Sequence, residues 1–185
     1  RRQRQMCIRD SLSTGTEVRK WPSDEDVKTA AKSTVIYSAA RRSWAFGILE
    51  RINRGMFSSP RNAPPPLNRA TYEVEHVMPQ AMNAVWEQDL SEWGEANPSQ
   101  LHQSHLHVLG NLTLTQVNQE LGRLRFEEKK VLLGDDTLKL NREVVTSESW
   151  TENRINERSA ALAKKACRVF IAPLNAEEIE EAARH

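Results

Sequence analysis

Two adjacent side chains near the middle of the chain, Glu75 and His76, carry the chemistry that activation of water requires. A histidine with an ordinary pKa near ~6.5 can take a proton from water at neutral pH. A carboxylate is a hard oxygen ligand of the kind that Mg²⁺ or Mn²⁺ prefers. Hydrolysis of a phosphodiester needs such a base together with groups that stabilise charge on the transition state. The pair is a candidate for such chemistry, with Asn111 and Asn118 as further candidates, although His76 taken alone is more often a structural histidine.

Short elements must bring these distant residues together. Residues 71–77 alternate apolar and polar side chains, as a strand does, and Pro79 stops the pattern. The run at 112–115 favours a second strand, and two helical stretches follow it, divided near Gly122. Adjacent residues of a strand point to opposite sides, so Glu75 and His76 can share one site only if the strand ends there. We expect two short strands followed by a helix.

Most of the remaining chain shows helical signals. Ser23 can cap a helix whose first turn is acidic, and helical spacing continues to Ile52 with a possible break at 34–36, which predicts two helices or a bent one. A longer amphipathic helix is expected over 151–169, and Asn175 can cap a final one. The fold class predicted is α+β, mostly helical.

A proline-rich stretch gives the best internal boundary. It divides the chain into a basic helical segment (1–57), a proline-rich connection (58–69), a core (70–133) with a helical insertion (81–107), and a C-terminal helical segment (134–185) that packs on the core. We expect these parts to form one structural domain, excised from a larger protein, because the chain starts at Arg1 without a methionine.

Composition excludes several classes of protein. The 185 residues carry a net charge of +1, and no apolar run approaches the roughly 20 residues of a membrane span. Only Cys7 and Cys167 occur, far apart, so a disulfide framework or a cysteine-rich zinc module has no support. Residues 1–70 hold 14 positive and 6 negative charges, whereas 71–110 hold 6 negative charges and four histidines. We expect a cytoplasmic protein without contact to a membrane.

Three stretches in this order resemble the HNH nucleases: EHVMP at 75–79, LGNLTL at 109–114, and Asn118 before a helix. The longer pattern, with WPSDED upstream and FEEKK downstream, is similar to the C-terminal nuclease domain of GmrSD-type restriction systems. The resemblance implies a ββα-metal core around one divalent ion, Mg²⁺ or Mn²⁺. It also implies a bacterial defence role against phage or modified DNA, and a preceding ParB-like nucleotidase domain in the full-length protein.

The resemblance assigns a role to each candidate. His76 is the general base, Asn111 orients it through an oxygen bonded to the imidazole, and Glu75 and Asn118 hold the metal. His107, close to Asn111 in the sequence, is expected beside the site. Two departures stand out: 35 positions separate His76 from Asn111, more than in compact HNH motifs, and the acidic ligand is Glu where many relatives have Asp.

Several basic side chains could hold the DNA backbone. They flank the presumed metal helix or lie on the first helices: Arg123, Arg125, Lys129, Lys130, Arg41, Arg42, Arg51 and Arg54. For those near 123–130 the alternative is a solvated helix face paired with Glu127 and Glu128.

Four other interpretations stay open at this stage. His102, His105 and His107 could form a zinc cluster, although no cysteine or other nearby ligand completes a tetrahedron. The domain could also be an RNase of the same fold, or a catalytically weak module that only binds DNA. A plain structural appendage of a nucleotidase is the last alternative.

Overall fold

A single two-stranded sheet among many short helices organises the part of the chain that the structure describes, residues 21–171 of a computed structural model. Its elements are α2 (Asp24–Ala30), η2 (Ala39–Arg41), α3 (Arg42–Gly55), η3 (Pro60–Asn62), β1 (Glu73–His76), α4 (Ala84–Glu92), α5 (Pro98–His105), η4 (Leu109–Asn111), β2 (Leu112–Thr115), α6 (Asn118–Leu121), α7 (Phe126–Gly134), η5 (Lys139–Asn141), α8 (Arg142–Val145) and α9 (Glu152–Val169). The predicted α+β, mostly helical class is confirmed. The helix predicted after Asn175 lies outside the described residues, and the predicted division into segments stays a prediction.

The first helical region consists of two helices, one of the two outcomes that the sequence allowed. Ser23 caps α2: its Oγ accepts a hydrogen bond from the backbone of Asp26, whose carboxylate in turn accepts one from the backbone of Ser23. The helix ends at Ala30, and a stretch without regular structure that contains Tyr37 leads to η2 and α3. This stretch matters because it brings Tyr37 to the sheet.

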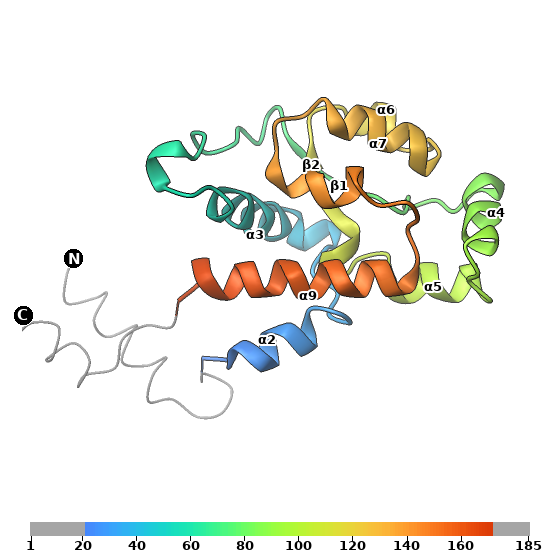
Figure 1. The fold of residues 1–185 in the computed structure, drawn as a ribbon, viewed down its shortest axis with the longest axis horizontal. Helices are drawn as coiled ribbons and strands as arrows, with labels where there is room; N and C mark the ends of the chain where they lie inside the picture. The colour runs from blue at the N-terminus through green and yellow to red at the C-terminus, as the bar shows by residue number, and fades with distance from the viewer. Residues whose placement is uncertain (1–20, 172–185) are drawn as a thin grey trace, which may run out of the picture.

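Helix α9 runs through the middle of the fold (Figure 1), with α2 on one side and α3 and the sheet on the other. Thr151 caps it by accepting a hydrogen bond from the backbone of Arg154. Its buried side chains include Ile155, Leu162 and Ala163. The prediction of a helix over 151–169 is confirmed.

Strands β1 and β2 pair antiparallel, with Glu75 opposite Thr113 and His76 opposite Leu112. Val74, opposite Leu114, joins one apolar core with α3 and α9. A second apolar core, which includes Trp86 and Phe126, forms around α4, α5 and α7. The hairpin thus lies where the two cores meet, and residues at its end are held from both sides.

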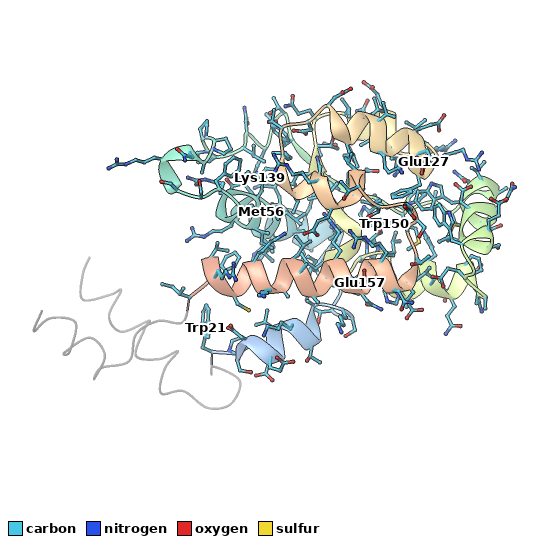
Figure 2. The ribbon with its side chains drawn as sticks, viewed as in Figure 1. Trp21, Met56, Glu127, Lys139, Trp150 and Glu157 are labelled. Carbon is cyan, nitrogen blue, oxygen red and sulfur yellow. The ribbon has the colours of Figure 1, made fainter. Side chains whose placement is uncertain are left out.

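A buried arginine ties α9 to the approach to β2. Arg158 donates hydrogen bonds to the carbonyl oxygens of Gly110 (2.6 Å), Leu112 (2.8 Å) and Leu140 (3.2 Å) and lies over the ring of Trp150, labelled in Figure 2. Burial lowers its pKa to about 10, so the group stays charged at neutral pH. One side chain thus provides hydrogen-bond donors for three buried carbonyl oxygens.

None of the helices between residues 21 and 171 is both long enough and apolar enough to cross a lipid bilayer.

Candidate active site

The ring of His76 sits at the end of β1 among other aromatic rings. Its Nε2 lies 3.0 Å from Nδ1 of His107, and Tyr37 meets it edge-on at a centroid distance of 4.6 Å. Tyr37 also stacks on His107 at 5.6 Å. The side chain of His76 is almost fully buried. The predicted position of His107 beside the site is where the structure places it, and the three rings leave His76 little freedom to rotate.

One ring nitrogen of His76 is left over. Within residues 21–171, Nδ1 is buried and has no hydrogen-bond partner. Burial, followed by the proximity of His107 and Lys129, lowers the pKa of His76 to about 3. The imidazole is therefore neutral at pH 7, and the hydrogen bond to His107 is consistent with a proton on Nε2 and a lone pair on Nδ1. That lone pair is the one available to accept a proton.

Glu75 is held by a buried lysine. Lys129 Nζ donates to Glu75 Oε1 (2.6 Å) and to the carbonyl oxygen of His76 (2.9 Å). Burial raises the pKa of Glu75, and the neighbouring ammonium group acts in the opposite direction. The side chain of Lys129 has no exposed surface, so the predicted role of this residue in binding DNA is wrong. It positions the acidic residue and the backbone next to it.

Asn118 begins α6 and reaches back to β1. Its Nδ2 donates to Glu73 Oε2 (2.9 Å), while its Oδ1 is buried without a hydrogen-bond partner in the described part of the chain. Glu75, His76 and Asn118 line one pocket of about 450 Å³, together with Arg123 from the turn after α6. Three of the four predicted site residues are therefore brought to one hollow.

The oxygen ligands expected for a divalent ion fit this pocket. A carboxylate from Glu75 and an amide oxygen from Asn118 line it, and the second of these is a buried acceptor that lacks a donor. Among residues 21–171, no group of three or more His, Cys, Asp or Glu side chains is arranged to hold a metal. Any ion here would keep waters or take phosphate oxygens as its other ligands, as Mg²⁺ commonly does.

Asn111 has a different role from the one predicted. Its Oδ1 accepts from the backbone of Met78 (2.8 Å) and from Trp150 Nε1 (2.9 Å), and its Nδ2 donates to the carbonyl oxygens of Met78 and Leu106. Its carbonyl oxygen accepts from Val77 N (2.9 Å). No oxygen of Asn111 bonds the imidazole, which was the expectation. The residue instead fixes the backbone that follows His76, and it is a positioning residue.

Most of the chain matches one known protein family. Residues 21–165 match the model of the family described as GmrSD restriction endonucleases, C-terminal domain. The chain belongs to this family. No curated protein and no solved structure gives a significant match. Membership makes the chain a domain of a restriction endonuclease, and it confirms the resemblance seen in the sequence.

In this GmrSD-type domain, the basic side chains near residues 123–130 differ in their surroundings. Arg123 lines the pocket that also contains Glu75, His76 and Asn118. Arg125 is paired with Asp89, and Lys130 with Glu127 (2.7 Å). For Lys130 the alternative of a paired helix face is therefore what the structure shows.

Two further predicted DNA contacts, Arg41 and Arg42, come from η2 and the start of α3. Both are exposed and lie outside the lining of the pocket.

The three histidines of the zinc alternative have separate partners. His102 Nε2 lies 2.8 Å from the carbonyl oxygen of Pro79, His105 Nδ1 lies 2.7 Å from Ser104 Oγ, and His107 contacts His76. This arrangement gives the zinc alternative no support. The contact to Pro79 instead fixes the chain just beyond the site.

Sequence reasoning missed two members of this GmrSD-type site. Tyr37 carries no motif, and only its place between two helices, where a break in the helical pattern was noticed, could have suggested a special position. Lys129 lies in the FEEKK stretch, whose charge pattern is that of an ordinary solvated helix and predicts a DNA contact, so the sequence gives no sign of its burial.

Proposed function

We propose that this domain is a metal-dependent DNA endonuclease of the HNH type, acting in a bacterial restriction system against phage DNA. The observation that carries the proposal is the pocket lined by Glu75 and His76 from β1 and by Asn118 from α6. Strand β2 lies between β1 and α6 in the sequence. Strand, strand and helix follow in the order that the ββα-metal resemblance implies. Membership in the restriction endonuclease family supports the same conclusion.

His76 is the general base of the proposed reaction. Its Nδ1 takes a proton from a water molecule, whose oxygen attacks the phosphorus as the bond to the leaving oxygen breaks. The hydrogen bond to His107 holds the ring in the tautomer that leaves Nδ1 free. A phosphate anion in the pocket would raise the pKa of His76 from its low value, because a nearby negative charge favours the protonated ring. Substrate binding would thus make the base stronger.

Glu75 and Asn118 are the residues that would hold Mg²⁺ or Mn²⁺. When bound, such an ion supplies Lewis-acid stabilisation of the charge that develops on the phosphate oxygens. Lys129 keeps the carboxylate of Glu75 in place, and the buried Oδ1 of Asn118 has no competing donor among the described residues. Arg123, which lines the same pocket, can contact a phosphate oxygen.

The wider biological setting follows from the family. We infer that the domain acts in the bacterial cytoplasm on phage or modified DNA, with a ParB-like nucleotidase domain preceding it in the full-length protein. The family consists of C-terminal domains of restriction endonucleases, which is consistent with a preceding domain.

A plasmid assay tests the activity. Supercoiled DNA incubated with the protein and Mg²⁺ or Mn²⁺ should be nicked or linearised, and His76→Ala should lower the rate at least about 100-fold, the usual contribution of a general base. His105→Ala, the same substitution in a histidine outside the pocket, is the matched control and should retain activity. Equal cutting by His76→Ala and wild type would exclude the base assignment.

Two further arms decide between the alternatives. A labelled RNA of the same sequence, hydrolysed faster than the DNA, would indicate an RNase. Binding of DNA without cleavage in either metal would indicate a module that only holds DNA.

A further inference from the structure

Basic side chains gather at the ends of α3 and α9, away from the catalytic pocket. One hollow of about 380 Å³ is lined by Lys139, Arg142, Lys165 and Arg168, and a neighbouring one of about 390 Å³ by Arg51 and Arg54. Gly55 lines both hollows, and neither shares a lining residue with the pocket that contains His76. We call the six cationic residues the basic surface.

Its charge is only partly compensated. Glu143 is paired with Lys165 (2.7 Å), and Glu50 with Arg54 (3.8 Å). Among residues 21–171, six cationic side chains against these two carboxylates leave an excess of four, although the whole chain has a net charge of only +1. Arg142 and Arg168 are exposed, and neither side chain has a hydrogen-bond or ion-pair partner within residues 21–171.

Helix dipoles explain only part of this arrangement. Arg54 and Arg168 lie in the last turns of α3 and α9, where a cation is favoured. Lys139 Nζ donates to the carbonyl oxygen of Met56 (3.0 Å), at the end of α3, and Figure 2 shows these two residues side by side. Arg142 begins α8, which has only four residues, so no helix dipole accounts for its charge. Its exposed guanidinium has no carboxylate partner among residues 21–171 and is free to contact an external anion.

We propose that the basic surface binds the phosphate backbone of duplex DNA; the inference rests on the proposed function and deepens it. Cations from α3, η5, α8 and α9 face two adjacent hollows, which suits a string of phosphates better than one small anion. Tyr37, which touches His76, precedes α3, whereas the basic surface is at the opposite end of that helix. A helix of 14 residues is about 20 Å long, or about six base pairs of duplex. The separation along α3 is thus shorter than an ordinary duplex substrate.

The experiment measures binding without cleavage. A fluorescent duplex that exceeds this span is titrated with the protein in a chelator, at several salt concentrations between about 50 and 200 mM. Arg142→Glu and Arg168→Glu should each weaken binding and lower the slope of log K against log salt by about one, as loss of a phosphate contact does. Lys32→Glu makes the same change of charge at an exposed residue just after α2 and should leave the slope unchanged.

The outcomes separate this proposal from the proposed function. If wild type and both arginine variants share one slope, or if wild type fails to bind the duplex, the basic surface is not a DNA site, whatever the plasmid assay shows. If the arginine variants lose affinity while plasmid cutting is absent in wild type, the surface stands and the nuclease proposal fails. Tighter binding to vesicles of phosphatidylserine and phosphatidylcholine than to DNA would also overturn the assignment.

A kinetic readout adds a second check. Arg142→Glu should raise KM for DNA and leave kcat close to that of wild type, because the side chain lies outside the catalytic pocket. A fall in kcat with an unchanged KM would contradict the proposed role.

Discussion

Lys129 Nζ lies 2.6 Å from Glu75 Oε1, and the lysine side chain has no exposed surface. The same ammonium group donates to the carbonyl oxygen of His76 at 2.9 Å. One cation thus fixes the side chain of the proposed metal ligand and the backbone of the proposed base. A buried ion pair of this kind contributes little net stability, but removal of one partner leaves the other charged and unsolvated.

Lys129→Met should therefore destabilise the fold by about 3 to 5 kcal/mol, measured by chemical denaturation, because the buried carboxylate of Glu75 loses its partner. The control is Lys130→Met, which removes the pair with the exposed Glu127 and a hydrogen bond to the carbonyl oxygen of Ser147, and should cost about 1 to 2 kcal/mol. The double variant Glu75→Met with Lys129→Met should recover most of the loss. Equal losses for the two lysine variants would show that the buried pair is not special.

Gly110 should tolerate no side chain. A Cβ at this position would collide with the carbonyl oxygen of Ile155 and with Ser159 Oγ, which accepts a hydrogen bond from Gly110 N. Gly110→Ala should lower the free energy of unfolding by about 3 kcal/mol, because α9 must move away from η4. Gly47→Ala is the matched control: a Cβ there meets nothing within 4 Å, and alanine within α3 should add about 0.5 to 1 kcal/mol. Thermal unfolding of the two variants gives the comparison.

Acid should destabilise the domain through His76. Its pKa is lowered from 6.5 to about 3 by burial and by neighbouring cationic groups, so below pH 6.5 the unfolded chain binds a proton that the folded one does not. Stability should fall as the pH decreases through this window. Between pH 6.5 and about pH 5 the loss from this group is about 2 kcal/mol.

The measurement compares wild type with His76→Gln, since the variant lacks the titrating ring. Chemical denaturation at each pH should show a smaller acid loss for the variant, by about the amount just given. Parallel curves for the two proteins would contradict the inference.

The elements of the fold follow from local sequence patterns to a large extent. The strand at 112–115, the cap at Ser23 and the helix over 151–169 are set by propensity, by a capping side chain and by an amphipathic stripe. Trp44 shows the limit of such patterns. It fits the apolar spacing of the first helices, yet its side chain is 75% exposed, because packing partners and not spacing decide burial.

The sequence predicts which residues form the site better than it predicts the hydrogen bonds that hold them. Glu75, His76 and Asn118 reach one pocket, as motif order indicates. The partners of Asn111 and Lys129 depend on where α5, α7 and Trp150 dock, and no local pattern contains that information. Local patterns therefore link the amide of Asn111 to the imidazole although it holds the backbone, and they predict a DNA contact for Lys129 although its side chain is buried.

Asn118 offers the sharpest test of the metal assignment. If its buried Oδ1 is a ligand, Asn118→Leu, which is similar in size and lacks the oxygen, should weaken binding of Mn²⁺ at least about tenfold in calorimetry, the loss typical of altered metal-site residues. Asn118→Asp keeps an oxygen at the same place, adds a charge and should bind the ion at least as well as wild type, although its hydrogen bond to Glu73 is lost. Gln119→Leu, at the exposed neighbouring position that lines the same pocket, should leave Mn²⁺ affinity unchanged. If Asn118→Leu binds Mn²⁺ as wild type does, the amide is only a helix residue bonded to Glu73, and the ion must be sought elsewhere.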